Sequence, residues 1–252
     1  MNDVDLAATL ARRAGRTAHE MLQAGVEGWR KSSAGDLVTA ADHAAEELVA
    51  AALAEARPGD GVVGEEGAAS EATTGRTWFV DPVDGTYNFV NGLTWWCSAL
   101  ALQESGEVVL GAVYHPHDDQ VWVGGRDLPT ARNGEAVARL ADRSLADCSL
   151  TTYLHRSYFA SADVAEPFGS VAAAAKVVRA GGSGSMDLAA VADGRLDLWC
   201  QHDAAEWDWM PGFALVEGAG GAVAHVEARG ITWSLAGPPT AVREAADLLR
   251  SA

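Results

Sequence analysis

Hydrophobic residues recur along the chain with two periods, one typical of helices and one typical of strands. Helical spacing predicts an amphipathic helix over residues 4–22 and a second one that begins at Thr39, a favourable N-cap residue. Pro58 and Gly59 would end this second helix. Short apolar or alternating runs predict strands in the rest of the first half. These strands are residues 61–64, 77–80, 95–102, 108–114 and 120–123.

Strands and helices alternate from about residue 144 onward. Strands are predicted at residues 149–153, 176–179, 196–199 and 222–226, and helices at 162–175, 185–192 and 209–218. Pro238 and Pro239 precede a last amphipathic helix that reaches Leu249. A sheet with helices followed by strand–helix alternation predicts a layered α/β protein.

Charge and cysteine content limit the partners and the cellular compartment that we expect for this protein. The chain has 252 residues and a formal net charge of −17, which argues against nucleic acid and anionic membranes as partners, because both are polyanions. No apolar run approaches the ~20 residues of a membrane span, and no terminal segment resembles a signal peptide. Cys97, Cys148 and Cys200 are scattered and odd in number. They predict free thiols in a reducing cytoplasm.

The segment after the predicted strand at residues 77–80 carries the strongest chemical signal. Pro82 cannot continue a central strand, so a turn is expected there. Such a turn would bring the side chains of Asp81 and Asp84 and the carbonyl of Val83 toward one point. Oxygen ligands of this kind suit a hard divalent cation such as Mg²⁺. A polar turn that only caps a helix is the alternative for so short a motif.

Gly85 and Thr86 follow at once, at the expected start of a short helix whose amides would bind phosphate. A cation site beside an anion site suggests metal-assisted phosphate chemistry. The whole run D-P-V-D-G-T-Y-N-F resembles the signature of the inositol monophosphatase family, which are Mg²⁺-dependent, lithium-sensitive phosphomonoesterases.

Three further segments are similar to motifs of that family. The segment from Lys31 to Asp42 resembles K-S-x-x-D-x-V-T-x-x-D with one extra residue before Asp36. Gly64-Glu65-Glu66 resembles G-E-E, and the segment from Glu206 to Gly221 resembles W-D-x-x-A-G…E-x-G-G. Taken alone, Asp42 would be a helix cap, the glutamates a solvated strand end and Lys31 a surface residue.

The resemblance implies a five-layer αβαβα sandwich. Its N-terminal half, residues 1–140, would carry most metal ligands, and its C-terminal half, residues 141–252, would carry Asp208 and the substrate-recognition segments. Two or three Mg²⁺ ions and a homodimer are also implied.

The resemblance implies roles for individual residues as well. Glu65 and Thr86 would orient the attacking water, with Asp42 beside them. The metal ligands would be Glu65, Asp81, Val83, Asp84 and Asp208. Phosphate and substrate would contact Gly85, Thr86, Gly182, Ser183, Gly184, Gln201 and Asp208, with Lys31 and Glu206 as further candidates. The chain departs from the family at Met210-Pro211-Gly212, where Pro211 is expected within the first turn of a helix.

Electrostatics supports reading these acids together. Five carboxylates gathered at one site would repel each other, and without cations some would have to bind protons. Divalent cations remove that conflict and keep the carboxylates ionised near neutral pH. The expected activity is Mg²⁺-dependent hydrolysis of a small phosphate monoester.

The motifs predict the type of reaction more closely than they predict the substrate. Inositol 1-phosphate is the first candidate, although Gln201 stands where inositol-selective relatives carry Glu. Histidinol phosphate is the alternative, because Glu206 would suit a cationic substrate, and other relatives hydrolyse fructose bisphosphate or nucleotide bisphosphates. From a different class, the protein would be a catalytically poor relative that binds a phosphorylated metabolite or a partner protein.

Overall fold

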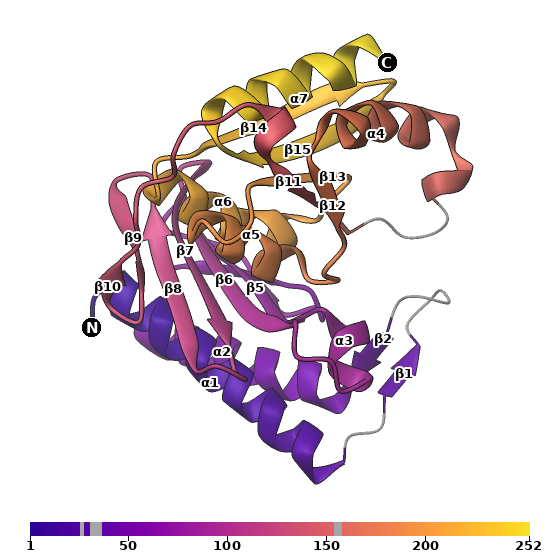
Figure 1. Ribbon diagram of the computed structural model, residues 1–252. Coiled ribbons are helices and arrows are strands. Elements are labelled where there is room, and N and C mark those ends of the chain that lie inside the picture. Colours follow the sequence, from indigo (N-terminus) through magenta and orange to yellow (C-terminus); the bar gives the residue numbers. More distant parts are fainter. Residues whose placement is uncertain (26–27, 31–36, 154–157) are drawn as a thin grey trace.

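The computed structural model describes residues 1–25, 28–30, 37–153 and 158–252, and its elements form five layers (Figure 1). The α-helices of the described part are α1 (Asp3–Ala24), α2 (Ala40–Ala56), α3 (Thr86–Val90), α4 (Ala162–Ala174), α5 (Gly184–Ala192), α6 (Glu206–Gly218) and α7 (Pro239–Ser251). Two 3₁₀-helices, η1 (Leu145–Asp147) and η2 (Tyr158–Ala160), lie between β10 and α4 in chain order. The strands are β1 (Gly28–Arg30), β2 (Leu37–Thr39), β3 (Gly61–Gly64), β4 (Ala69–Ser70), β5 (Arg76–Asp84), β6 (Cys97–Glu104), β7 (Glu107–His115), β8 (Gln120–Gly125), β9 (Leu128–Arg132), β10 (Glu135–Ala136), β11 (Ser149–Thr151), β12 (Val177–Arg179), β13 (Leu198–His202), β14 (Ala222–Ala228) and β15 (Ile231–Gly237).

Two large sheets organise the described chain, besides the small β1–β2 pair. The first has the order β10-β9-β8-β7-β6-β5-β3-β4, and within it only β3 and β5 run parallel to each other. The second has the order β12-β11-β13-β15-β14, with β12, β11 and β13 parallel and β15 antiparallel to both neighbours. The meander of strands expected from the first half is therefore confirmed.

Helices separate and cover the two sheets. Helices α1 and α2 pack on one face of the eight-stranded sheet, and α6 packs on strands β5 to β8 of that sheet. Helices α5 and α6 also contact strands of the five-stranded sheet, whose other side carries α4 and α7 (Figure 1). This order of layers confirms the αβαβα sandwich.

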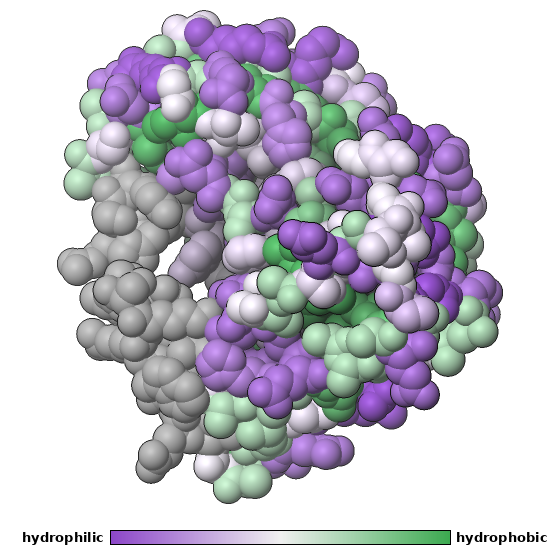
Figure 2. Space-filling model, turned by 180° about the vertical axis from the view of Figure 1, so that it is seen from behind, coloured by the Kyte–Doolittle hydropathy of each residue, from purple (hydrophilic) through white to green (hydrophobic). Residues whose placement is uncertain are grey.

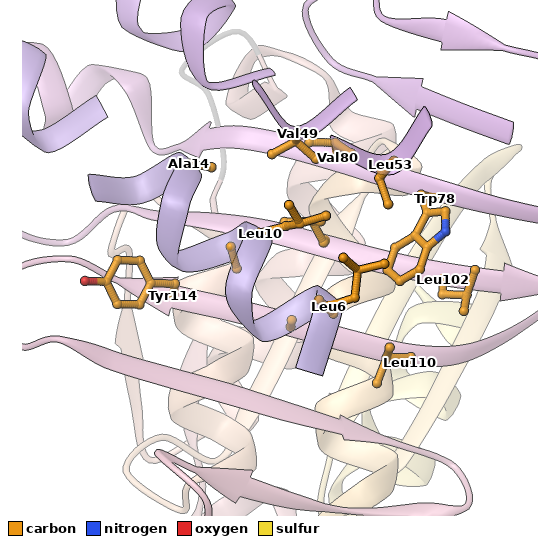
Figure 3. Close-up of a cluster of buried hydrophobic side chains, with 14 of the residues drawn as sticks. Leu6, Leu10, Ala14, Val49, Leu53, Trp78, Val80, Leu102, Leu110 and Tyr114 are labelled. Atoms are coloured by element: carbon orange, nitrogen blue, oxygen red, sulfur yellow. The ribbon is translucent and has the colours of Figure 1, made fainter. Parts of the chain in front are cut away.

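The largest hydrophobic cluster explains the first two layers. Leu6, Leu10 and Ala14 of α1 belong to one cluster with residues of the sheet, in which Leu6 lies beside Trp78 and Leu102 (Figure 3). Each of these side chains is at most 3% exposed. Full burial of one such leucine contributes about 1.5–3 kcal/mol. The helical period of the N-terminal sequence therefore determines which face of α1 covers the sheet.

Several predicted elements need correction. Strand β15 was not predicted, although it pairs with both β13 and β14. Strand β13 lies two residues later than expected and includes Gln201. Strand β5 continues through Pro82, where its pairing with β6 is irregular, instead of ending in a turn. Because α6 begins at Glu206, Pro211 lies in its second turn and not in the first.

The surface carries many charged groups, as expected for a chain with a net charge of −17. On the face seen from behind, hydrophilic residues alternate with apolar areas (Figure 2). In the part of the chain that the structure describes, no helix combines the length and the apolar character needed to cross a membrane. The three cysteines are free and buried, as predicted.

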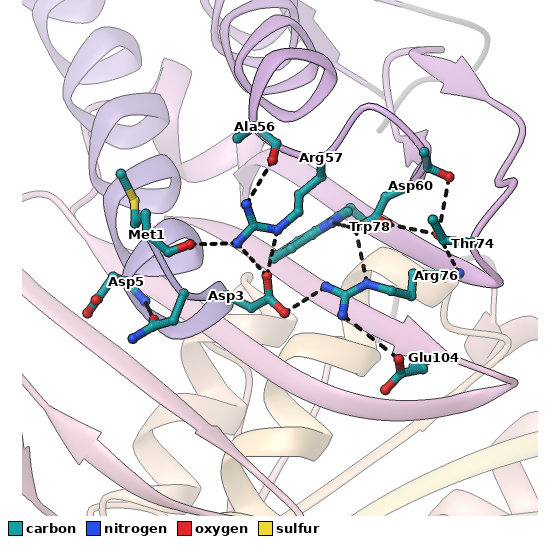
Figure 4. Close-up of polar contacts among 12 residues, drawn as sticks. Met1, Asp3, Asp5, Ala56, Arg57, Asp60, Thr74, Arg76, Trp78 and Glu104 are labelled. Carbon is teal, nitrogen blue, oxygen red and sulfur yellow. Dashed lines mark hydrogen bonds and ion pairs between the residues drawn. The ribbon is translucent and has the colours of Figure 1, made fainter.

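A polar network fastens the start of α1 to the end of α2 and to β5 (Figure 4). The Asp3 carboxylate accepts hydrogen bonds from Arg57 at 2.8 Å and from Arg76 at 2.6 Å. Arg76 also binds Asp60, which in turn accepts a hydrogen bond from the Trp78 indole at 3.0 Å. Arg76 is held between carboxylates, whereas Arg57 binds Asp3 and the carbonyl oxygens of Ala56 and Met1. Each arginine side chain is only 22% exposed.

We expect Asp3→Asn to lower the free energy of unfolding near neutral pH by about 1–2 kcal/mol, between the values for exposed and for fully buried ion pairs. Burial opposes the charge of Asp3, but its bonds to Arg76 and Arg57 prevail and lower its pKa. The stabilisation is therefore complete above the ordinary carboxyl pKa and is lost as the pH falls through the lowered one. Chemical denaturation should show the difference between wild type and variant shrinking below about pH 4. Asp5→Asn is the control, an exposed acid of the same turn; equal losses in both variants would contradict the role of the network.

Candidate active site and metal centre

The end of β5 brings two aspartates to the same side of the strand. Asp81 pairs with Ala99 of β6 and Asp84 pairs with Cys97, so β5 has one extra residue between the two pairs. Residues three apart in a regular strand would face opposite sides, because side chains alternate. The extra residue is a β-bulge and reverses the direction of the following side chain. Pro82 and Val83 therefore do not turn the chain away but bend it so that both carboxylates converge.

Asp208 completes a cluster of three carboxylates. It lies in the first turn of α6, on the layer between the two sheets. Oxygen atoms of Asp81, Asp84 and Asp208 all lie within 4.8 Å of one another. Three of the predicted metal ligands, from segments more than 120 positions apart, thus meet at one point.

The cluster is electrostatically unfavourable without a cation. Burial raises the pKa of Asp81 well above its ordinary value, and the charges of Glu65, Asp84 and Asp208 raise it further. Burial and the charge of Asp84 raise the pKa of Asp208 to about 7. Glu65 also forms a side-chain hydrogen bond with Asp81, which places the fourth predicted carboxylate at the same site. Hard oxygen donors that repel each other fit a divalent cation such as Mg²⁺.

Asp84 also binds the N-terminus of α5. Its two oxygens accept hydrogen bonds from the amides of Gly184 at 3.2 Å and Ser185 at 2.5 Å. A carboxylate at the start of a helix is stabilised by the free amides and by the helix dipole. The hydroxyl of Ser183 caps the same helix by accepting a hydrogen bond from the Met186 amide. The predicted substrate segment from Gly182 to Gly184 therefore lies directly beside the acidic cluster.

Two glycine turns meet at this place. Gly85, the N-cap of α3, has φ +97°, and Gly182 has φ +91°, both in the region that favours glycine. A Cβ on Gly85 would lie 3.1 Å from the Gly182 carbonyl oxygen and 3.1 Å from the Ser183 Cβ. The start of α3 at Thr86 is confirmed, and the close backbone approach explains why glycine precedes it.

Thr86 links the bulge to the second helix. Its hydroxyl lies 3.1 Å from the Val83 carbonyl oxygen and 3.4 Å from the Asp42 carboxylate. Asp42 is fully buried and forms a capping box with Thr39, whose backbone amide donates to it at 2.9 Å. Burial, helped by the charge of Glu66, raises the pKa of Asp42 to about 6. Asp42 therefore both caps α2 and contacts Thr86, but it stands apart from the three-carboxylate cluster.

The remaining predicted substrate residues differ in their surroundings. Gln201 is 7% exposed, and its amide oxygen accepts hydrogen bonds from the Thr152 hydroxyl and the Tyr153 amide, so this oxygen is committed to the β11–β13 region. Glu206 is exposed at the start of α6. Lys31 and Asp36 lie outside the described residues. The roles of Gln201, Glu206 and Lys31 stay predictions.

Two buried residues that the sequence analysis missed join the segments around the site. Asn88 of α3 donates to the carbonyl oxygens of Trp95 at 2.6 Å and Gly181 at 2.9 Å. Asp187 of α5 accepts hydrogen bonds from the Trp95 indole at 2.8 Å and the Thr151 hydroxyl at 2.5 Å. Asn88 stands within the signature itself, but nothing in the local spacing marks Asp187.

Comparison with known proteins agrees with this geometry. The family model described as "Inositol monophosphatase family" matches residues 2–249. The chain belongs to the inositol monophosphatase family. It is 35% identical over 192 residues to "Inositol-1-monophosphatase" of Rhizobium meliloti, covering 74% of this chain and 71% of that protein. It is 34% identical over 194 residues to "Histidinol-phosphatase" of Mycobacterium tuberculosis, covering 75% and 74%.

A solved structure has the same fold. The crystal structure of extragenic suppressor protein suhB from Bartonella henselae matches with a TM-score of 0.88 and 27% identity, covering 98% of this chain and 97% of that chain. As a member of the inositol monophosphatase family, this protein is a phosphatase of phosphate monoesters. The family is metal-dependent, and the buried cluster of Asp81, Asp84 and Asp208 provides donors that can hold a metal.

We expect the metal-free phosphatase to lose stability as the pH rises from about 4 to about 7, because folded Asp208 binds a proton more tightly than the unfolded chain does. Above that range the repulsion is complete. Without metal, Asp208→Asn should then be more stable than the wild type by about 1–3 kcal/mol. Added Mg²⁺ should reverse the order, because it stabilises only a folded chain that binds it.

Thermal unfolding with a chelator or with Mg²⁺, at several pH values, measures both effects. Asp127→Asn, at an exposed acid, is the control and should follow the wild type. An Asp208→Asn protein that is no more stable than the wild type in chelator above neutral pH would contradict the assigned repulsion.

Proposed function

We propose that this protein hydrolyses a small phosphate monoester with Mg²⁺ as cofactor, and that inositol 1-phosphate is its preferred substrate. One observation carries the proposal. Asp81 and Asp84 immediately precede the first turn of α3 in the chain, and Asp208 joins them in space to form the three-carboxylate cluster. The first amides of a helix lack intrahelical partners and favour an anion. A phosphate between this turn and the carboxylates would meet both kinds of group.

The chain's own residues would orient the attacking water. The Thr86 hydroxyl has a single proton and lies within reach of both the Val83 carbonyl and Asp42. When it donates to either of them, its lone pairs remain available to accept a hydrogen bond from a water molecule. Glu65, beside Asp81, is the second acceptor for that water. These two groups define the direction of attack.

Two or three Mg²⁺ ions, held by Glu65, Asp81, Asp84, Asp208 and the Val83 carbonyl, would supply Lewis-acid chemistry and offset the negative charge of the leaving group. The leaving group would lie toward Asp208 and the turn of Gly182, Ser183 and Gly184, since these are neighbours through Asp84 and α5. The matched motifs contain no cysteine or histidine that could form a covalent phosphoenzyme. Water would therefore attack the phosphorus atom directly.

The relative named "Inositol-1-monophosphatase", which is 35% identical, supports inositol 1-phosphate as the substrate. Histidinol phosphate is the second candidate, since a relative named for that activity is 34% identical. Exposed acids at Asp203 and Glu206, just before Asp208, would favour its cationic group. A cytoplasmic location, the homodimer, the division near residue 140 and the alternative of a catalytically poor binding protein stay predictions.

We expect Asp81→Asn, Asp84→Asn and Glu65→Gln each to lower Mg²⁺-dependent phosphate release at least about a hundredfold while the chain stays folded. Each substitution keeps the shape of the side chain and removes a negative donor. Phosphate release and circular dichroism of each variant are the measurements. Asp127→Asn, at an exposed acid, is the control. Full activity in a folded variant would remove that residue from the ligand set.

We expect a panel of phosphate esters to show the highest kcat/KM for inositol 1-phosphate, by about tenfold or more. The panel includes histidinol phosphate, fructose 1,6-bisphosphate and adenosine 3′,5′-bisphosphate. A preference for histidinol phosphate that Glu206→Gln weakens would establish the second candidate instead. No turnover of any ester, with binding retained, would favour a binding protein.

A further inference from the structure

Helix α2 buries a second carboxylate one turn after Asp42. Glu46 is 4% exposed, although residues in the same stripe, Ala45, Val49 and Leu53, belong to the hydrophobic core. A charge at such a position is costly unless it is hydrogen-bonded. The carboxylate is therefore expected to accept hydrogen bonds that an apolar residue at this position could not accept.

Both oxygens of Glu46 bind the backbone of the loop that carries Glu65. One oxygen accepts the amide proton of Glu66 at 2.8 Å, and the other accepts the amide proton of Ala68 at 2.7 Å. The loop closes on itself around this carboxylate, since the Gly64 amide donates to the Ala68 carbonyl at 2.8 Å. Gly67, with φ +107°, allows the tight reversal.

Gly64 shows how closely the carboxylate fits. A Cβ on Gly64 would overlap the carboxylate of Glu46. The φ of Gly64 is not in the left-handed region, and the three atoms nearest to such a Cβ all belong to the Glu46 carboxyl group. The contact is therefore specific to these two residues.

The clamp determines where Glu65 points. The Glu65 amide donates to the Val80 carbonyl of β5 at 3.1 Å, and the next amide, that of Glu66, is held by Glu46. The backbone is thus fixed on both sides of Glu65, whose side chain faces Asp81. Rotation of this loop would therefore break the hydrogen bond between the Glu65 and Asp81 side chains.

We propose that Glu46 is a positioning residue, which holds the Gly64–Ala68 loop so that Glu65 completes the metal site. This inference rests on the proposed function, in which Glu65 is a metal ligand. Only a carboxylate offers two acceptors to two amides; in Glu46→Gln, one acceptor is replaced by an NH₂ group that would face an N–H. Outer partners that orient ligands commonly change metal affinity by about ten- to a hundredfold.

The test combines a readout without metal and one with metal. In metal-free protein, Glu46→Gln should increase hydrogen exchange at the Glu66 and Ala68 amides at least about tenfold, because these bonds are weakened. In phosphate release, the half-saturating Mg²⁺ concentration should rise about tenfold, and most of the lost rate should return at saturating Mg²⁺. Gly64→Ala, which displaces the same carboxylate from the other side, should have the same two effects.

The matched control is Glu47→Gln, at the exposed neighbour on α2, which should leave both readouts unchanged. Wild-type exchange and wild-type Mg²⁺ dependence in folded Glu46→Gln would overturn the inference. Faster exchange with unchanged Mg²⁺ dependence would also overturn it, because the clamp would then serve only the loop. A Glu46→Gln protein that does not fold would assign Glu46 to the fold and likewise reject the inference. If the wild type releases no phosphate with Mg²⁺, the proposed function fails, whereas the exchange experiment still tests the clamp.

Discussion

The mutual repulsion of buried carboxylates at the end of β5 is the constraint on which the rest of the site depends. Asp81 lies against Glu65, Asp84 and Asp208, and its pKa is raised well above its ordinary value. Such an arrangement destabilises the folded chain unless a cation neutralises it. The carboxylates therefore lower the stability of the folded chain, and packing in the surrounding layers must be sufficient to hold them in place.

The two sheets and the helices between them provide that packing at the site itself. The bulge at Pro82–Val83 belongs to the eight-stranded sheet, whereas Asp208 lies on α6, which packs on both sheets. Asp84 joins these layers directly, because its carboxylate binds the first amides of α5. The metal centre thus lies where the layers meet. A shift of one layer against another would alter its geometry.

Buried polar residues around the centre act by holding backbone. Asn88 ties α3 to the Gly181 turn, Asp187 ties Trp95 to β11, and Glu46 ties α2 to the Glu65 loop. Each of them accepts or donates at least two hydrogen bonds, which offsets the cost of its burial. Glycines let these groups approach the backbone closely, because a Cβ on Gly64, Gly181 or Gly182 would lie against Glu46, Asp187 or Asn88, respectively. These hydrogen bonds hold the backbone segments around carboxylates that repel one another.

Local sequence determined the helices, the donor residues and the helix start at Thr86, because hydrophobic period, capping and the D-P-V-D-G-T motif act over a few residues. The family and its layered fold followed from the same motifs. Only the tertiary structure decided that Pro82 lies in a bulge, that the Gln201 amide oxygen is engaged with the β11–β13 region, and that Glu46 clamps the loop of Glu65. The first two outcomes depend on pairing between strands of one sheet, and the third depends on a contact between α2 and the loop after β3. Contacts between residues that are distant in the sequence are set by tertiary packing, which spacing along the chain does not encode.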